Sequence, residues 1–466
     1  MNRETIAALA TAPGLSGLAV IRLSGEFALE VATKCIRTYI PIKDTKPNTI
    51  HFGKFIFESE IIDEVTASVF HKPKSYTGED VVEISCHGGT IISDMILSVL
   101  INSGARLAEP GEFTKRAFLN GKMDLTQVEA VSDIIHSNNE KSAQTSARQL
   151  DGGFTKRITE LRNKLIEIAA LLELEMDFFD EDIDLIEKNK INEKINETIS
   201  YCSNLSNNYK NAEILRSGYF VAIAGYPNSG KSTLFNALLD RTRAIVSDIP
   251  GTTRDYLEES LHYEDCIVRI IDTAGIRDTN DFIEIEGIKF ANKILSQSNL
   301  ILLINDATKG FDNSLAIYET LKEKYKDIEI IILQNKMDLF TDNPEKPILQ
   351  NKMNLLTDNY ENKKVFLFIS AQTGTNINTL KEFIHKKSIE KPSTINDVLL
   401  NQRQTLLLKK AEKELKDAIS AINKNFENEI VSFHIRKASQ YLGEVTGETW
   451  SEEVLNSIFS KFCIGK

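Results

Sequence analysis

The sequence of 466 residues lacks a long apolar run, and no stretch approaches the about 18 residues that a membrane span needs. The N-terminal segment Met1–Ile6 contains an acidic residue and leads into no cleavable apolar core, so we expect neither a signal peptide nor a transit peptide. Positive charge is also in deficit. The formal net charge is −12, which argues against a protein that binds nucleic acid mainly through bulk charge.

Cysteine is scarce and scattered. The five cysteines, at positions 35, 86, 202, 266 and 463, show no Cys-x-x-Cys spacing. This pattern favours neither a disulfide framework nor a zinc site, so we expect a protein of the reducing cytoplasm. The hydrophobic content of 42% is enough to form buried cores, and the length suggests about three domains.

A phosphate-binding loop is present in the middle of the chain. Gly225–Ser232 fits the pattern G-x-x-x-x-G-K-[ST], follows the apolar run Tyr219–Ala224 and precedes the helical stretch Ser232–Leu239. A strand, a glycine turn and a helix in this order direct backbone N–H groups at a phosphate. Lys231 is expected to reach the β- and γ-phosphates, and the Ser232 hydroxyl to ligate Mg²⁺. The predicted nucleotide contacts of this loop are Asn228, Ser229, Gly230, Lys231, Ser232 and Thr233.

Three further motifs follow apolar runs in the order typical of a GTPase. Asp272 can hold Mg²⁺ through water, and the Gly275 N–H can bond the γ-phosphate. The Asp338 carboxylate can accept two N–H bonds from guanine that adenine cannot supply, and a backbone N–H at Ser370-Ala371 can meet the guanine oxygen. Together these patterns predict a GTPase domain. The residues are Asp272, Thr273, Ala274 and Gly275 in the second motif, Asn335, Lys336, Met337 and Asp338 in the third, and Ser370 and Ala371 in the fourth.

The second motif departs from the Ras pattern. Ras-like enzymes place a glutamine just after the glycine to orient the attacking water, whereas this chain has Ile276 beside Gly275. Carboxylates are available nearby at Glu284 and Glu286. For each of them the alternative is a solvated carboxylate at a helix start, which is the commoner role of a glutamate there.

The third motif is nearly duplicated. The segment 332–343 recurs sixteen positions later as 348–359, with Asn354 in place of Asp338. An amide at that position would face the guanine donors with its own NH₂ group. We therefore assign guanine recognition to Asn335, Lys336 and Asp338, and interpret the second copy as a loop insertion.

The flanks of the GTPase segment are helical, and the N-terminal part differs from both. Apolar stripes at helical spacing predict core-facing helices. Because neither flank makes a bundle alone, we infer one helical domain with the GTPase inserted, joined near Gly218 and residues 391–393. Short alternating runs before residue 120 predict a compact α+β domain. The stripes are Ile158, Leu161, Leu165, Ile168, Leu172; Ile191, Ile195, Ile199, Cys202, Leu205; and Leu415, Ile419, Ile422, Phe426.

Several motifs together resemble the bacterial tRNA-modification GTPase family MnmE, also called TrmE. They are the asparagine-bearing loop Gly225–Ser232, Pro250–Asp255, the C-terminal Phe462–Lys466, and the N-terminal segments Ala19–Gly25, Ser75–Glu83, His87–Gly89 and Pro110–Asn120. The likeness runs from about Thr5 to Lys466, and the C-terminal motif on a GTPase-bearing chain is highly specific. The duplicated segment is the one clear departure.

The resemblance implies a multidomain fold: an α+β folate-binding and dimerisation domain (1–120), a helical domain in two parts (121–217 and 389–466), and an inserted α/β P-loop, Ras-like GTPase domain (218–388). It implies a homodimer that forms a heterotetramer with an FAD- and NADH-using partner, MnmG or GidA. The complex would add an aminomethyl or carboxymethylaminomethyl group to C5 of the wobble uridine of certain tRNAs. GTP, Mg²⁺, K⁺ and 5,10-methylene-tetrahydrofolate, for which 5-formyl-tetrahydrofolate is an analogue, would be its cofactors.

Residue roles also follow from the resemblance. Glu284 would orient the attacking water, and Cys463 would act near the reacting carbon, although a small buried hydrophobe is the commoner role of a free cysteine. Mg²⁺ would be held by Ser232 and Thr253, and K⁺ by Asn228, Ser247, Ile249 and Thr252. Folate contacts would fall on Arg22, Glu83, Lys122 and Lys466. Further nucleotide contacts would come from Ser247, Asp248, Ile249, Pro250, Gly251, Thr252 and Thr253.

Two other classes of GTPase share features with this chain. A ribosome-assembly GTPase of the Era or EngA type shares the asparagine P-loop but carries a basic RNA-binding module, and neither a GXXG loop in a basic setting nor a positive tail is evident. A lipid-anchored signalling GTPase is suggested by a cysteine four residues from the end. The tail Cys463–Lys466 fails the prenylation pattern at Gly465 and at Lys466, and no polybasic stretch precedes it.

Overall fold

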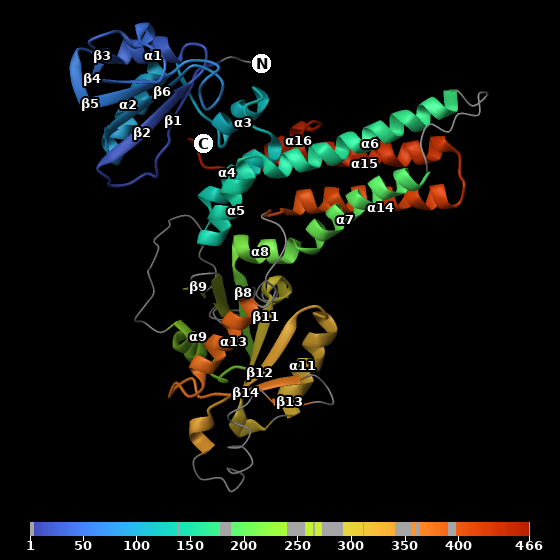
Figure 1. Cartoon of the computed structure of the whole chain (residues 1–466). Coiled ribbons are helices and arrows are strands. Elements are labelled where there is room, and N and C mark those ends of the chain that lie inside the picture. The colour runs from blue at the N-terminus through green and yellow to red at the C-terminus, as the bar shows by residue number, and fades with distance from the viewer. Residues whose placement is uncertain are drawn as a thin grey trace, which may run out of the picture. The chain divides into compact units, whose positions relative to one another are not determined.

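The computed structural model describes residues 4–137, 139–177, 188–239, 257–263, 266–272, 292–310, 312–340, 357–359, 364–389 and 398–465. The chain divides into two compact units (Figure 1). The first comprises residues 1–135, 146–206 and 402–466, and the second residues 136–145 and 207–401. In the described parts of the chain, no helix is long and apolar enough to cross a membrane. The finer boundaries near residues 120, 218 and 388 remain predictions.

The N-terminal part of the first unit is a seven-stranded sheet in the order β3-β4-β5-β6-β2-β1-β7. Its neighbours are antiparallel except for the β1–β7 pair. On β5, Val65, Ala67 and Val69 are buried while the residues next to them are not. This alternation places one face of the strand toward the core that it shares with α1 and α2. The α+β prediction is confirmed. The elements are β1 Ile6–Leu9, β2 Leu18–Ser24, α1 Ala28–Cys35, β3 Ile36–Thr38, β4 Thr49–Phe57, β5 Glu60–Phe70, β6 Val81–His87, α2 Thr90–Asn102, β7 Arg106–Leu107 and α3 Glu112–Leu119.

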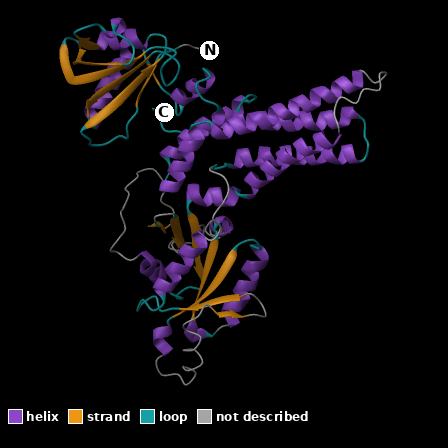
Figure 2. Ribbon diagram, in the orientation of Figure 1, coloured by secondary structure: helices purple, strands orange, loops and turns teal. Residues whose placement is uncertain are grey.

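The rest of the first unit is helical (Figure 2). The predicted stripe from Ile158 to Leu172 is buried along α6, which packs against α15. Phe426, the last member of the third stripe, was predicted to lie in the core, and this is wrong. The helix α14 ends at Asn423, Asn425 takes a left-handed conformation, and Phe426 is 51% exposed beyond the turn. The helices are α4 Leu125–Ile135, α6 Gly153–Asp177, α7 Lys188–Asn207, α14 Gln402–Asn423, α15 Asn428–Thr446, α16 Glu452–Phe459, and α5 Glu140–Leu150, whose residues 140–145 are counted with the second unit.

The second unit is built on a sheet in the order β13-β14-β12-β11-β8-β10-β9. The five central strands are parallel, and every residue of β11 is buried, as expected for a strand covered on both faces. The helices α9 and α13 pack on one face and α11 on the other (Figure 2). The elements are α8 Tyr209–Ser217, β8 Tyr219–Gly225, α9 Lys231–Leu239, β9 Leu257–His262, β10 Ile267–Asp272, β11 Leu300–Asp306, α11 Asp312–Lys324, β12 Glu329–Asn335, β13 Thr357–Asn359, β14 Lys364–Phe368 and α13 Ile377–Ile389.

The end of the duplicated segment differs from the predicted loop. Its last three residues, Thr357–Asn359, form β13, which pairs antiparallel with β14 at the edge of the sheet. A strand edge presents unpaired N–H and C=O groups, and the returning chain satisfies them here. Asn354 lies outside the described residues.

Candidate functional site

The phosphate-binding loop lies between β8 and α9, at the carboxyl end of the parallel strands. The Lys231 side chain is buried, and its Nζ donates to the carbonyls of Gly225 (3.0 Å) and Tyr226 (2.8 Å). These bonds hold the ammonium against the loop at the N-terminus of α9. Asn228 has φ +62° and an exposed side chain, and Ser232 and Thr233 place exposed hydroxyls in the first turn of the helix. Polar groups therefore gather where the helix N-terminus favours an anion.

The P-loop serine and the aspartate of the second motif meet. The Ser232 hydroxyl donates to Asp272 Oδ2 at 3.1 Å. Asp272 is the last residue of β10, which pairs in parallel with β8, and its side chain is buried. The carboxyl ends of parallel strands share one edge of the sheet, so two motifs forty residues apart become neighbours. A hydroxyl and a carboxylate oxygen are ligands that Mg²⁺ prefers.

Asn335 connects the P-loop with the fourth motif. Its Nδ2 donates to the Ser229 carbonyl at 2.9 Å, and its Oδ1 accepts the Ala371 N–H at 2.9 Å. The Ser370 N–H donates to the Thr375 carbonyl. The backbone N–H groups of Ser370 and Ala371, one of which was predicted to meet the guanine oxygen, thus both have partners within the unit. Asn335 acts as a brace between two loops, which its sequence motif alone does not reveal.

The other side chains of the third motif are also held in place. The Ser370 hydroxyl donates to Asp338 Oδ1 at 2.5 Å, and the Met337 N–H donates to the Ile369 carbonyl. Lys336 Nζ pairs with Asp306 Oδ2 at 2.6 Å. Burial alone would raise the pKa of Asp306, but hydrogen bonds from Lys336 and Thr308 outweigh it and lower the pKa.

Asp306 was not predicted as a site residue. It is the last residue of β11, so it lies at the same edge of the sheet as Asn335, its register partner on β12. The signal that could have identified it is the polar pair Asn305-Asp306 directly after the apolar run of that strand.

Several predicted site residues lie outside the described residues, and their roles remain predictions. They are Ser247, Asp248, Ile249, Pro250, Gly251, Thr252, Thr253, Thr273, Ala274, Gly275, Glu284 and Lys466.

A second set of predicted residues lies on the N-terminal sheet. Arg22 on β2 faces Glu83 on β6, and its Nε and Nη2 both lie 2.7 Å from Glu83 Oε1. The guanidinium also lies over the rings of Tyr76 and Phe113, at 5.1 and 5.6 Å from their centroids. Lys122 does not join this pair, because its ammonium donates to the Pro73 carbonyl instead.

Beside this pair, a chain of ion pairs links two of the four N-terminal segments that carry the family resemblance. Arg116 bonds both Glu79 and Glu112, and Glu112 in turn bonds Arg106. Burial pushes the pKa of Glu112 upward, but the bonds from Arg106, from the Glu109 N–H and from Arg116 outweigh it and lower the pKa to about 2. Segments 75–83 and 110–120, which carried the resemblance, are thus held together by charge.

Cys463 has an exposed side chain, whereas the other four cysteines are buried. The alternative of a small buried hydrophobe is therefore wrong for this residue. Its thiol is the one cysteine in the described chain that reagents or substrates can reach.

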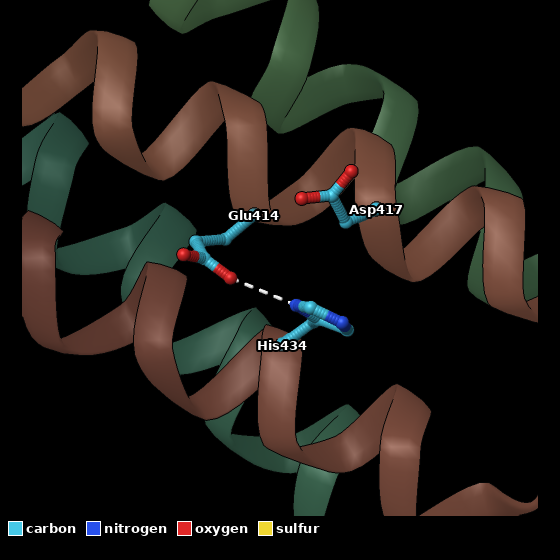
Figure 3. A group of neighbouring side chains, drawn as sticks. All are labelled: Glu414, Asp417 and His434. Atoms are coloured by element: carbon cyan, nitrogen blue, oxygen red, sulfur yellow. Dashed lines mark hydrogen bonds and ion pairs between the residues drawn. The ribbon is translucent and has the colours of Figure 1, made fainter.

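Glu414 and Asp417 on α14 lie close to His434 on α15 (Figure 3), with their nearest ligand atoms within 4.8 Å of one another. Glu414 accepts from His434 Nδ1 and pairs with Lys437 Nζ, both at 2.8 Å. Burial would raise the pKa of Glu414, but these two partners outweigh it and lower the pKa. An ammonium of the chain already supplies the positive charge here, so we assign the cluster to helix pairing.

Comparisons with known proteins cover the whole chain. Residues 125–463 match the family described as MnmE helical domain, and residues 5–122 match the GTP-binding protein TrmE N-terminus. The tRNA modification GTPase MnmE of Salinibacter ruber is 38% identical over 467 residues, which cover 99% of each chain. That of Aquifex aeolicus is 40% identical over 468 residues, which cover 100% of each chain.

Among solved structures, Era in complex with MgGDPNP and a segment of 16S ribosomal RNA is similar at 28% identity, with a TM-score of 0.29, over 42% of this chain and 66% of that chain. The two family descriptions and the full-length relatives agree with each other. The chain therefore belongs to the MnmE family of tRNA modification GTPases, and it is a GTP-binding GTP hydrolase that acts in tRNA modification.

Proposed function

We propose that this GTP hydrolase works with an FAD- and NADH-dependent partner subunit, MnmG (GidA), to add an aminomethyl or carboxymethylaminomethyl group to C5 of the wobble uridine of certain tRNAs in the cytoplasm. The one-carbon unit would come from methylene-tetrahydrofolate. The observation that carries the proposal is the full-length likeness to MnmE proteins. The exposed Cys463, two residues before the Gly465 carbonyl that Arg22 binds, supports it.

The nucleotide site supports Mg²⁺ chemistry. Ser232 would hold the ion with Thr253, and Asp272, whose carboxylate accepts from the Ser232 hydroxyl, would hold it through water, while Lys231 would neutralise the β- and γ-phosphates. Asp338, oriented by the Ser370 hydroxyl, would accept the guanine N–H groups. The bound Mg²⁺ would stabilise charge that develops on the transferred phosphoryl group.

A potassium ion would depend on Asn228. Its side chain is exposed in the loop and offers a hard amide oxygen, and Ser247, Ile249 and Thr252 would complete the site. Glu284 would orient the attacking water in place of the missing glutamine. The bound cation would supply the charge that other GTPases obtain from an arginine finger.

The folate site would lie at Arg22 and Glu83, with Lys122 and Lys466 as further contacts. A carboxylate can accept N–H groups from an aminopyrimidine ring, and a guanidinium stacked over aromatic rings suits a planar, anionic ligand. Dimerisation would use the N-terminal domain. Ile50 and Phe52 lie two residues apart on one face of β4, and both side chains are exposed, which would suit a surface that a second protomer covers.

A reconstituted reaction tests the proposal. Transfer RNA from a strain lacking this chain would be incubated with it, the partner subunit, GTP and methylene-tetrahydrofolate, and the wobble nucleoside measured by mass spectrometry. We expect modification only with all components, and loss in Cys463→Ser with potassium-stimulated GTP hydrolysis retained. Unmodified tRNA in the complete reaction would contradict the proposal.

A further inference from the structure

The C-terminal tail is packed onto the N-terminal part of the first unit. Chain ends are usually poorly ordered unless something ties them down. Here Phe462 is buried in an apolar cluster with Phe459 and Phe118, and Gly465, the last described residue, is buried too. Cys463 and Ile464 lie between these anchors and are exposed. The tail is therefore held on both sides of its thiol.

The first anchor depends on Gly111, the residue before α3. Its φ is +68°, and a Cβ at this position would lie 2.9 Å from the Phe459 carbonyl oxygen and 3.0 Å from Phe462 Cβ. Its N–H donates to the Cys463 carbonyl at 3.4 Å. Only a residue without a side chain lets the two segments approach this closely.

The second anchor is Gly465 itself. It has φ +100°, and a Cβ there would lie 2.1 Å from the Leu9 carbonyl oxygen. Leu9 ends β1, where it pairs with Ile21 on β2, and β7 pairs with the same strand two residues earlier at Ala7, so the Leu9 backbone cannot move aside cheaply. The Gly465 carbonyl in turn accepts from Arg22 Nη1 at 3.4 Å.

We infer that Gly465 is a positioning residue for Cys463: its missing side chain lets the tail lie against the end of β1, which holds the exposed thiol two residues from the carbonyl that Arg22 binds. Gly111 performs the same task at the other end of the tail. The consequence for the reaction rests on the proposed function of Cys463, whereas the docking of the tail does not.

Tail docking can be measured without any activity. A nitroxide attached to Cys463 of the full-length protein reports tail mobility by electron paramagnetic resonance, and the other four cysteines are buried. We expect a slow-motion spectrum for the wild type and a mobile component for Gly465→Ala. Gly104→Ala is the matched control, since Gly104 has φ +117° but its Cβ would meet only Val31 Cγ2, at 3.9 Å. That variant should keep the wild-type spectrum.

The chirality of residue 465 provides a second test of tail docking. Joining residues 1–462 to the peptide Cys-Ile-Xaa-Lys by chemical ligation regenerates Cys463 and allows D-alanine at position 465. A D-residue favours positive φ and turns its methyl group away from the side on which the Leu9 oxygen lies. We expect it to restore the slow-motion spectrum. An immobile label in Gly465→Ala, or a label as mobile with D-alanine as with L-alanine, would overturn the inference.

Activity then decides whether docking serves the reaction. Gly465→Ala should keep GTP hydrolysis and lose wobble-uridine modification by roughly 10²-fold, the effect of misplacing a reacting group by about 1 Å. A mobile tail with unchanged modification would overturn the positioning role. If the wild type itself fails to modify tRNA, the proposed function fails, while the spectra still decide the docking.

Discussion

Replacing Asn335 by alanine should weaken GTP binding more than any loss of general stability explains. Asn335 is 3% exposed at the end of β12 and makes one bond to the Ser229 carbonyl and one to the Ala371 N–H. The variant leaves both of these backbone groups without that partner. The P-loop and the fourth motif then lose the side chain that holds them together.

The expected size follows from those two groups. Leaving a buried donor or acceptor unpaired costs about 1–3 kcal/mol, so the GTPase unit should lose about 2–6 kcal/mol of stability. In the variant, a guanine nucleotide must order the P-loop and the fourth motif again when it binds. If about half of the upper value of this stability loss also weakens nucleotide binding, the dissociation constant for GTP rises roughly 10²-fold, since about 1.4 kcal/mol corresponds to a factor of ten.

Asn305→Ala is the matched control. Asn305 is 5% exposed near the end of the neighbouring strand, and its Nδ2 donates to Gly310 O and Gln334 Oε1, both at 2.8 Å. It bonds neither the P-loop nor Ala371. Denaturant unfolding should show a similar stability loss in both variants, and titration with a fluorescent guanine nucleotide should show weak binding only for Asn335→Ala. Equal losses of nucleotide affinity in the two variants would refute the inference that Asn335 holds the P-loop and the fourth motif together.

Three further outcomes follow from the sites. The pKa of Glu112 is lowered to about 2 from an ordinary 4.5, so its contribution to stability is complete above about pH 4.5 and is lost as pH falls toward 2; Glu112→Gln should flatten this part of the unfolding profile measured in denaturant. Asp338→Asn should weaken GTP binding and favour a xanthosine nucleotide, while Asn354→Ala should change little; competition binding showing the reverse would exchange the roles of the two copies. GTP turnover should be faster in potassium than in sodium, and Glu284→Ala should lose hydrolysis but keep affinity; equal rates in the two salts would refute the cation site.

The sheet of the GTPase unit could be predicted from local patterns. Each site motif directly follows an apolar run, and the structure places Gly225, Asp272, Asn335 and Ser370 at or just after the ends of neighbouring parallel strands. Chain order and strand polarity suffice for this, because the ends of parallel strands share one edge. The family resemblance supplied what the patterns could not, namely roles for the residues of the N-terminal domain and of the C-terminal tail.

The hydrogen-bond and ion-pair partners of the side chains could not be predicted from the sequence. Asp306 ends β11 and Lys336 directly follows β12, and only the register of these two strands brings the side chains to 2.6 Å. Phe426 fitted a helical period of the sequence, but the left-handed turn at Asn425 ended the helix before it. In both cases a tertiary or terminal constraint, rather than local periodicity, decided the outcome.

The C-terminal tail contains a motif residue, Gly465, whose structural role cannot be read from the sequence. From the sequence, Gly465 carries no side chain to recognise anything, and a residue next to the chain end is expected to be poorly ordered. In the structure it is buried because the Leu9 carbonyl occupies the space that any side chain would need. A short tail can gain little from apolar area, so its position must come from close backbone contact, for which glycine is required. The constraint that glycine satisfies lies more than 450 residues away in sequence, on β1, which is why no local pattern reveals it.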